Sequence, residues 1–241
     1  MGYTKVQLQQ GLNLIGAQFV AVGGQTATLN ALASLQGQAS YDDDFDPQAE
    51  LRVWTGSGYY TYEWSGDLST EQPDLAEELG GEDGSLDNQW LDAYETTDET
   101  LGAGVGFWVK ASGTGSVTLV GEVPAGATIT KSLSAGLNLV AYPWPTTASL
   151  SKIQLSGEPS YDDDFDPQCE LRVWTGSGYY TYEWSGALST EQPDLAEELG
   201  GEDGSLDNQW LDAYETTDAT IPAGTGFWIK AANAGTITFS K

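Results

Sequence analysis

Two short acidic motifs, each present twice, are the parts of the chain best suited to bind a metal ion. The first, between Tyr41 and Pro47, places aspartates at positions i, i+2 and i+4. An extended backbone would direct such aspartates to one side, and Ca²⁺ prefers several oxygen ligands of this kind. The residues are Asp42, Asp44 and Asp46 in one copy and Asp162, Asp164 and Asp166 in the other. An EF-hand is excluded, because Pro47 and Val53 stand where that loop needs glycine and glutamate.

The second acidic motif, Gly81–Asn88, mixes oxygen-bearing side chains with glycine. Its candidate ligands are Glu82, Asp83 and Asp87, with Glu202, Asp203 and Asp207 in the second copy. This composition suits a cation-binding loop and equally a solvated turn. Bound Ca²⁺ and a merely solvated acidic surface both stay open from the sequence.

Adjacent tyrosines supply a second kind of binding residue. Tyr59 and Tyr60 lie in an aromatic run that is repeated at Tyr179 and Tyr180. Strand alternation directs the two rings of each pair to opposite faces, so one face is expected in the core and the other outside. An exposed ring could stack on a sugar or fill a protein interface. Trp54, Trp64 and Trp108 are expected in the core.

Catalytic chemistry has little support in the residue types. The chain has no histidine and a single cysteine, Cys169, which the other copy replaces with Ala49. Histidine-based triads are therefore excluded, and a zinc site is not expected. Paired carboxylates beside tryptophan suggest glycoside hydrolysis, but 36 acidic residues guarantee chance pairs. We expect no enzyme activity, and we expect Cys169 to be a small buried residue, with an intermolecular disulfide as the open alternative.

An internal repeat organises the chain. Residues 40–99 match residues 160–219 at an offset of 120 with three differences, and the flanking segments match more loosely. The repeat predicts two domains of ordinary size, copy 1 at 3–121 and copy 2 at 126–241, with a short linker at 122–125.

Charge follows the same division. The net charge is −28, of which the two repeated centres carry −17 and −15, so the flanks are weakly basic. Such a chain repels nucleic acid and anionic membranes and attracts cations. No apolar run is long enough for a membrane span.

The elements that must position these residues are mostly strands. Alternating segments such as 4–9 and 129–134 predict half-buried strands, and 51–54 with 59–64 predict a hairpin around a glycine-containing turn. The last strands expected in each copy are 106–111 with 116–121, and 226–231 with 236–240. Short helices are expected at 73–79 and 193–199, where proline begins the segment and glycine follows it. The fold class predicted is all-β with minor helix, as two tandem sandwich-like or barrel-like domains.

Several segments together resemble a tandem β-module of bacterial and archaeal surface or secreted proteins. They are GLNLVAYPWP, LRVWTGSGYYTYEW, AGTGFWIKA and GTITFS. The resemblance implies a β-rich, non-catalytic, extracellular module and carries over no binding residue. Leu12 and Leu137 stand where that pattern usually has tryptophan.

The function expected first is a self-assembling structural protein of the cell exterior, such as a surface-layer or filament subunit. Calcium would stabilise it, and the terminal strands Tyr3–Gln9 and Thr236–Lys241 could add to a neighbour's sheet. The alternative is a tandem carbohydrate-binding module that uses exposed tyrosine and tryptophan. The start of the chain shows no signal peptide, although the extracellular location is expected.

Overall fold

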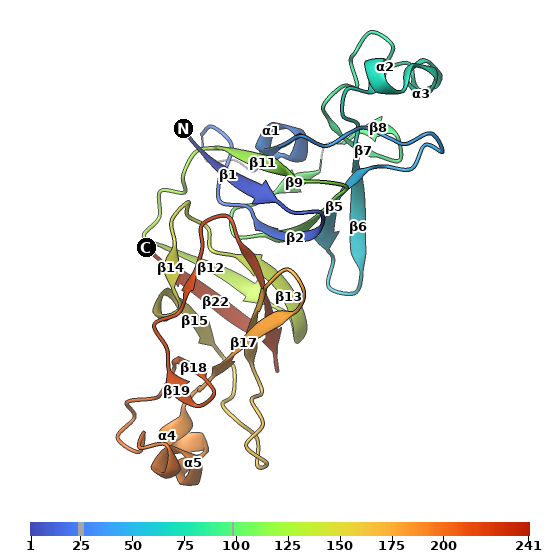
Figure 1. Cartoon of the computed structure of the whole chain (residues 1–241). Helices are drawn as coiled ribbons and strands as arrows, with labels where there is room; N and C mark the ends of the chain where they lie inside the picture. The colour runs from blue at the N-terminus through green and yellow to red at the C-terminus, as the bar shows by residue number, and fades with distance from the viewer. Residues whose placement is uncertain (24–26, 98) are drawn as a thin grey trace.

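The computed structural model describes residues 1–23, 27–97 and 99–241. Strands dominate, and the two copies repeat the same arrangement (Figure 1). Copy 1 contains β1 (Gly2–Leu8), β2 (Gly11–Gly16), β3 (Ala27–Thr28), α1 (Leu29–Leu32), β4 (Ala33–Gln36), β5 (Ala49–Trp54), β6 (Tyr59–Trp64), α2 (Leu68–Glu71), α3 (Pro73–Leu79), β7 (Trp90–Asp92), β8 (Glu95–Thr96), β9 (Thr100–Leu101), β10 (Gly106–Ala111) and β11 (Gly115–Gly121).

Copy 2 follows the same order, with a 3₁₀ turn in place of the first helix. It contains β12 (Thr128–Leu133), β13 (Gly136–Ala141), β14 (Ala148–Ser149), η1 (Leu150–Lys152), β15 (Ile153–Ser156), β16 (Glu170–Trp174), β17 (Tyr179–Trp184), α4 (Leu188–Glu191), α5 (Pro193–Glu198), β18 (Trp210–Asp212), β19 (Glu215–Thr216), β20 (Thr220–Ile221), β21 (Gly226–Ala231) and β22 (Gly235–Ser240). The all-β class and the β-sandwich character predicted from the sequence are confirmed.

Each copy is built as a sandwich of a three-stranded and a six-stranded antiparallel sheet. In copy 1 the orders are β1-β11-β4 and β2-β10-β5-β6-β7-β8, and copy 2 repeats both. Every one of these sheets takes its strands from a single copy. Alternation along the strands sends Leu51, Phe107 and Val109 into the space between the sheets, where they are fully buried.

The last two strands of each copy do not pair with each other. β10 pairs with β2 and β5 in the larger sheet, while β11 pairs with β1 and β4 in the smaller one. The terminal strands are likewise paired inside the chain: β1 pairs with β11, and β22 lies between β12 and β15. Donation of β22 to a neighbouring molecule would therefore require both of its ladders to open, whereas β1 lies at the edge of its sheet.

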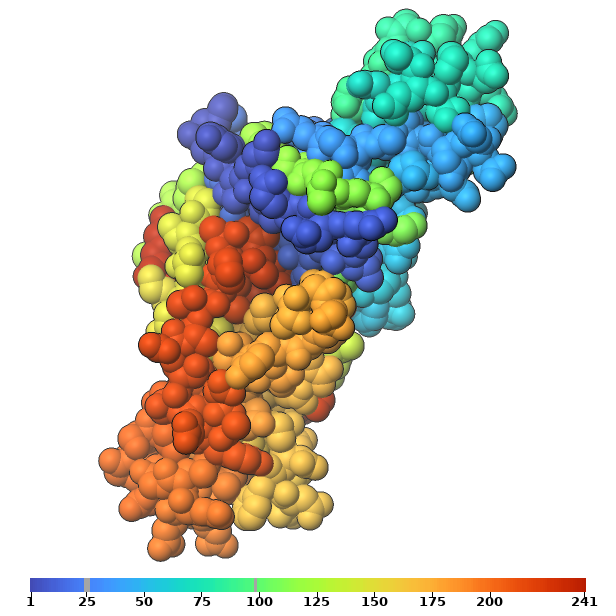
Figure 2. Space-filling view, in the orientation of Figure 1, coloured from blue at the N-terminus to red at the C-terminus, as the bar shows by residue number. Residues whose placement is uncertain are grey.

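A small helical lobe projects from each copy at residues 65–89 and 185–209. The helix predicted at 73–79 is confirmed as α3, and its counterpart α5 ends one residue before the predicted 199. Gly80 ends α3 at a left-handed φ of 71°, the usual role of glycine after a helix. Each lobe has its own apolar cluster, built around Leu68 and Leu75 in copy 1. The lobes lie at opposite ends of an elongated molecule, so the acidic residues that they carry are far apart (Figures 1 and 2).

The two copies pack against each other through the outer faces of their six-stranded sheets. Leu14 and Trp108 of copy 1 form one buried cluster with Leu139 and Trp228 of copy 2. Backbone hydrogen bonds join the copies at each side, from Gly16 N to Gly224 O (2.8 Å) and from Ala141 N to Gly104 O (3.0 Å). The equivalence of these contacts in the two directions gives the pair an approximate two-fold relation. Among the described residues, no helix is long and apolar enough to cross a membrane.

Candidate functional site

Aromatic residues of both copies meet at the edge of this interface. On the outer face of its sheet, Trp54 of β5 lies opposite Tyr59 of β6, with ring centroids 5.1 Å apart. Trp54 also packs edge-to-face on Trp228 of the other copy, at 5.3 Å. Copy 2 repeats the arrangement: Trp174 packs on Tyr179 at 5.1 Å and on Trp108 at 5.4 Å. Two runs of three rings therefore cross between the copies.

Hydrogen bonds across the interface hold two of these indoles in place. Trp54 Nε1 donates to the carbonyl of Leu137 at 2.9 Å, and Trp174 Nε1 donates to the carbonyl of Leu12 at 3.1 Å. Each tryptophan is thus bound to the backbone of the opposite copy while its ring stays partly exposed. A preorganised aromatic surface loses little side-chain freedom when a ligand binds.

Two cavities open between these rings and together form the aromatic groove. One, of about 210 Å³, is lined by Trp54, Tyr59, Leu137, Arg172, Tyr179 and Trp228. The other, of about 180 Å³, is lined by the equivalent residues Leu12, Arg52, Tyr59, Trp108, Trp174 and Tyr179. Tyr59 and Tyr179 line both, and each is 45% exposed. The two volumes together fall in the lower part of the range for ligand pockets, about 300–1,000 Å³.

The arginines of the groove are fixed by neighbouring carboxylates. Arg52 pairs with Glu50 at 2.6 Å, and Lys110 of β10 pairs with the same carboxylate. Burial raises the pKa of Glu50, but hydrogen bonds from Lys110 and Arg52 outweigh it and lower the pKa below its ordinary value. Copy 2 repeats the group at Glu170. Each group of three charges keeps one net positive charge beside the groove.

The predicted tyrosines divide between two locations. Tyr59 and Tyr179 meet in the groove, and burial raises the pKa of Tyr59. Tyr60 and Tyr180 are 53% and 47% exposed on the opposite face of their strands and line neither cavity. Both rings of each pair are therefore partly exposed, where the sequence led us to expect one.

The predicted core tryptophans also divide. Trp64 is 2% exposed inside its module. Trp108 is buried at 5%, but it lies in the contact between the copies, and Trp54 packs beside it with its ring partly exposed. The core position expected for all three therefore holds only for Trp64. Trp54 and Trp108 lie on the outer face of their sheet, where the second copy packs on them.

The first acidic motif uses its leading aspartate to close its own loop. Asp42 Oδ1 accepts hydrogen bonds from the backbone amides of Asp44 and Asp46, both at 3.0 Å, and Oδ2 accepts one from Gln48. Asp44 and Asp46 point into solvent. The second copy has the same bonds at Asp162, with Asp164 and Asp166 exposed.

The second acidic motif is also held by internal hydrogen bonds. Asp87 accepts from the amide and hydroxyl of Ser69 at 2.8 and 2.6 Å, which ties the loop to the start of α2. Asp83 accepts from Ser85, and this hydrogen bond lowers the pKa of the exposed carboxyl. Asp207 and Asp203 repeat these roles, while Glu82 and Glu202 are exposed. Among the described residues, no three His, Cys, Asp or Glu side chains come together as a metal site.

Cys169 is buried and bonded, as a structural residue would be. Its thiol donates to Glu158 at 3.0 Å, and burial together with this carboxylate raises its pKa to about 12. A thiol with so high a pKa is a poor nucleophile at neutral pH. An intermolecular disulfide at this position would require the site to open.

Sequence reasoning missed most of the groove. It selected Tyr59 and Tyr179 but not Arg52, Arg172, Leu12 or Leu137, whose contribution depends on how the copies pack. The alternation of β5 could have placed Arg52 and Trp54 on the same side as Tyr59. No family model, no curated protein and no solved structure matches this chain.

Proposed function

We propose that this chain is a non-catalytic carbohydrate-binding protein of the cell exterior in which the two copies share one site, the aromatic groove. The observation that carries the proposal is that Tyr59 and Tyr179, 120 residues apart, line the same two cavities with tryptophans and arginines of both copies. Sugar rings present apolar faces to aromatic rings and hydroxyls to charged donors, which this groove supplies side by side.

The groove also has the features of a binding site rather than those of a hydrophobic core. Its tyrosines are partly exposed, its indole N–H groups at Trp54 and Trp174 are satisfied by backbone, and its arginines are oriented by Glu50 and Glu170. Exposed, rigid aromatic rings beside fixed polar groups are a common feature of binding surfaces.

The test is glycan-array binding by the whole chain and by two matched double variants. We expect binding that falls at least tenfold, about 1.4 kcal/mol, in Tyr59→Ala with Tyr179→Ala. Tyr60→Ala with Tyr180→Ala removes two equally exposed rings outside the groove and should bind as the parent does. A blank array, or equal loss in both variants, would contradict the proposal.

Self-assembly with calcium is the second candidate. The observation that favours it is the separation of charge: each helical lobe carries only acidic charges and lies at an end of the molecule, while the flanks around the middle are weakly basic (Figure 1). Opposite surfaces of neighbouring molecules could then meet, and cations could link the lobes. We expect this candidate to give large particles in light scattering and a higher melting temperature in millimolar Ca²⁺ than in chelator. A protein that stays monomeric and melts at the same temperature with and without calcium would rule out self-assembly.

A further inference from the structure

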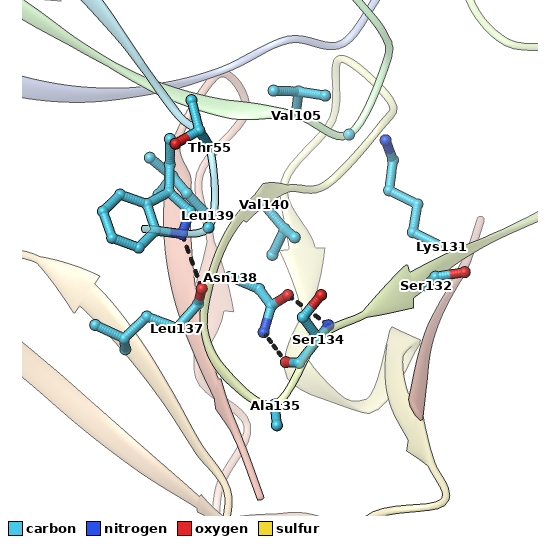
Figure 3. A pocket seen from close by; sticks show the side chains of 13 residues that line it. Thr55, Val105, Lys131, Ser132, Ser134, Ala135, Leu137, Asn138, Leu139 and Val140 are labelled. Carbon is cyan, nitrogen blue, oxygen red and sulfur yellow. Dashed lines mark hydrogen bonds between the residues drawn. The ribbon is translucent and has the colours of Figure 1, made fainter. Parts of the chain in front are cut away.

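A third cavity adjoins the aromatic groove on the far side of Trp54. It has a volume of about 270 Å³ and is bounded by the β5–β6 turn and residues 104–105 of copy 1, and by β12 and β13 of copy 2. Trp54 and Leu137 line both this cavity and the groove, so the two adjoin at one indole. The hydrogen bond that reaches the Leu137 carbonyl marks the shared wall in Figure 3.

Among the described residues, Lys131 is the one basic side chain in this lining. Its side chain extends from β12 toward Val105, across the cavity from Ser134 and Asn138 (Figure 3). None of the ion pairs found among the described residues includes it, and no hydrogen bond from its Nζ is found there. Burial lowers the pKa of its amine. A partly desolvated cation without a counter-charge is stabilised by any anion that enters beside it.

One hydroxyl of the cavity is also available. The amide side chain of Asn138 is already bonded, because it accepts from the amide of Ser134 and donates to the carbonyls of Ser134 and Gly136. The side chain of Ser134 has no such partner among the described residues. Ser132 follows Lys131 in β12, so its hydroxyl points to the other face of the strand (Figure 3). The cavity therefore combines one ammonium group with the Ser134 hydroxyl beside the edge of an aromatic surface.

Lys131 breaks the two-fold likeness of the two copies. The repeat places Val6 at the equivalent position, and the two residues share the same register in their sheets, opposite Val117 and Ile237. Both reach the equivalent glycine of the other copy, Gly104 for Lys131 and Gly224 for Val6. A groove built from repeated residues can bind a glycan chain in two equivalent orientations. A single amine at one end makes these two orientations unequal.

The strong negative charge of the whole chain does not oppose an anion here. The acidic residues are concentrated in the repeated centres, and each helical lobe lies at an end of the molecule. At physiological ionic strength charges are screened over about 8 Å. The carboxylates nearest the groove, Glu50 and Glu170, are each paired with an arginine and a lysine.

From these observations we infer that the cavity around Lys131 binds the carboxylate of an acidic sugar, a uronic acid unit at one end of a glycan whose other rings lie in the aromatic groove. This inference rests on the proposed function, because the groove must hold the rest of the chain. The ammonium of Lys131 would pair with the carboxylate, and Ser134 would hydrogen-bond to a neighbouring hydroxyl.

The test compares two probes of equal length, tetragalacturonate and its fully methyl-esterified form, by calorimetric titration of the whole protein. We expect the parent to bind the acid at least tenfold more tightly than the ester at low salt, and this preference to shrink as salt is raised. Lys131→Val installs the residue of copy 1, so it should fold normally. It should bind both probes as the parent binds the ester, while Lys131→Arg keeps the preference.

The outcomes separate the two proposals. Equal affinity of the parent for both probes, with the ester still bound, would overturn the acidic-sugar inference and leave the groove intact. A preference for the acid that persists in Lys131→Val would overturn the assignment to this residue. Failure of both probes to bind would overturn this inference, and the glycan array would then decide whether the groove binds other sugars.

Discussion

Replacing Trp228 with alanine is expected to lower the free energy of unfolding by about 3–5 kcal/mol. Its ring is 5% exposed and lies in the cluster that joins the copies, against Trp54 at 5.3 Å. Removing it leaves a cavity that the facing sheets cannot close without losing the backbone hydrogen bonds at Gly16 and Ala141. Denaturant unfolding of the full chain measures the change.

The same variant tests whether the copies unfold together. The parent is expected to unfold in one transition, because the interface is apolar and hydrogen-bonded at both sides. Trp228→Ala should broaden or split that transition, and Trp108→Ala, its equivalent in copy 1, should behave alike. Trp228→Phe, which keeps most of the apolar volume, should lower the free energy of unfolding much less. A loss below about 1 kcal/mol in the alanine variant would mean that the contact between the copies adds little stability.

Replacing Glu158 with glutamine is expected to raise the free energy of unfolding by about 1–3 kcal/mol, the usual cost of a buried polar atom without a partner. Glu158 Oε2 accepts from Cys169 and from the amides of Ala232 and Asn233, but Oε1 is buried with no partner among the described residues. A glutamine would keep the first oxygen and put an N–H donor in place of the second.

Copy 1 has a glutamine at the position equivalent to Glu158. Gln38, at the equivalent position, accepts from the amide of Ser112 at 3.0 Å and donates to the carbonyl of Gly113 at 3.2 Å. The reverse change, Gln38→Glu, should therefore destabilise copy 1 by a similar amount. Thermal unfolding measures both, at roughly 2–4 °C per kcal/mol for a chain of this size. A Glu158→Gln variant that melts at or below the parent temperature would contradict this account of the buried carboxylate.

Much of the fold within each copy follows from local rules. The hairpin β5–β6 and the helix α3 form where alternation, proline and glycine place them. The division of β10 and β11 between two sheets did not follow, because their alternation fits either sheet and only the packing of the whole copy decides. The helix α2 was also missed, since its four residues carry no periodic signal and its start is held by Asp87 from a distant loop.

The site was less predictable than the fold, for a physical reason. The local pattern around Tyr59 and Trp54 indicated a face but not what covers it, and the covering surface comes from the second copy. Asp42 was selected as a metal ligand from spacing and Asp87 from the composition of its loop, yet both accept hydrogen bonds from nearby N–H groups in the structure. Repeated sequence identified which residues are equivalent, and only the packing of the copies brought equivalent residues together.

The stoichiometry of glycan binding tests the central claim most directly. Calorimetric titration of the whole chain with a glycan selected from the array is predicted to give one ligand per chain, because both cavities share Tyr59 and Tyr179. Either single alanine variant at these tyrosines should weaken that one event. Two equivalent ligands per chain, with each single variant removing only one of them, would show that the copies bind separately and would contradict a shared groove.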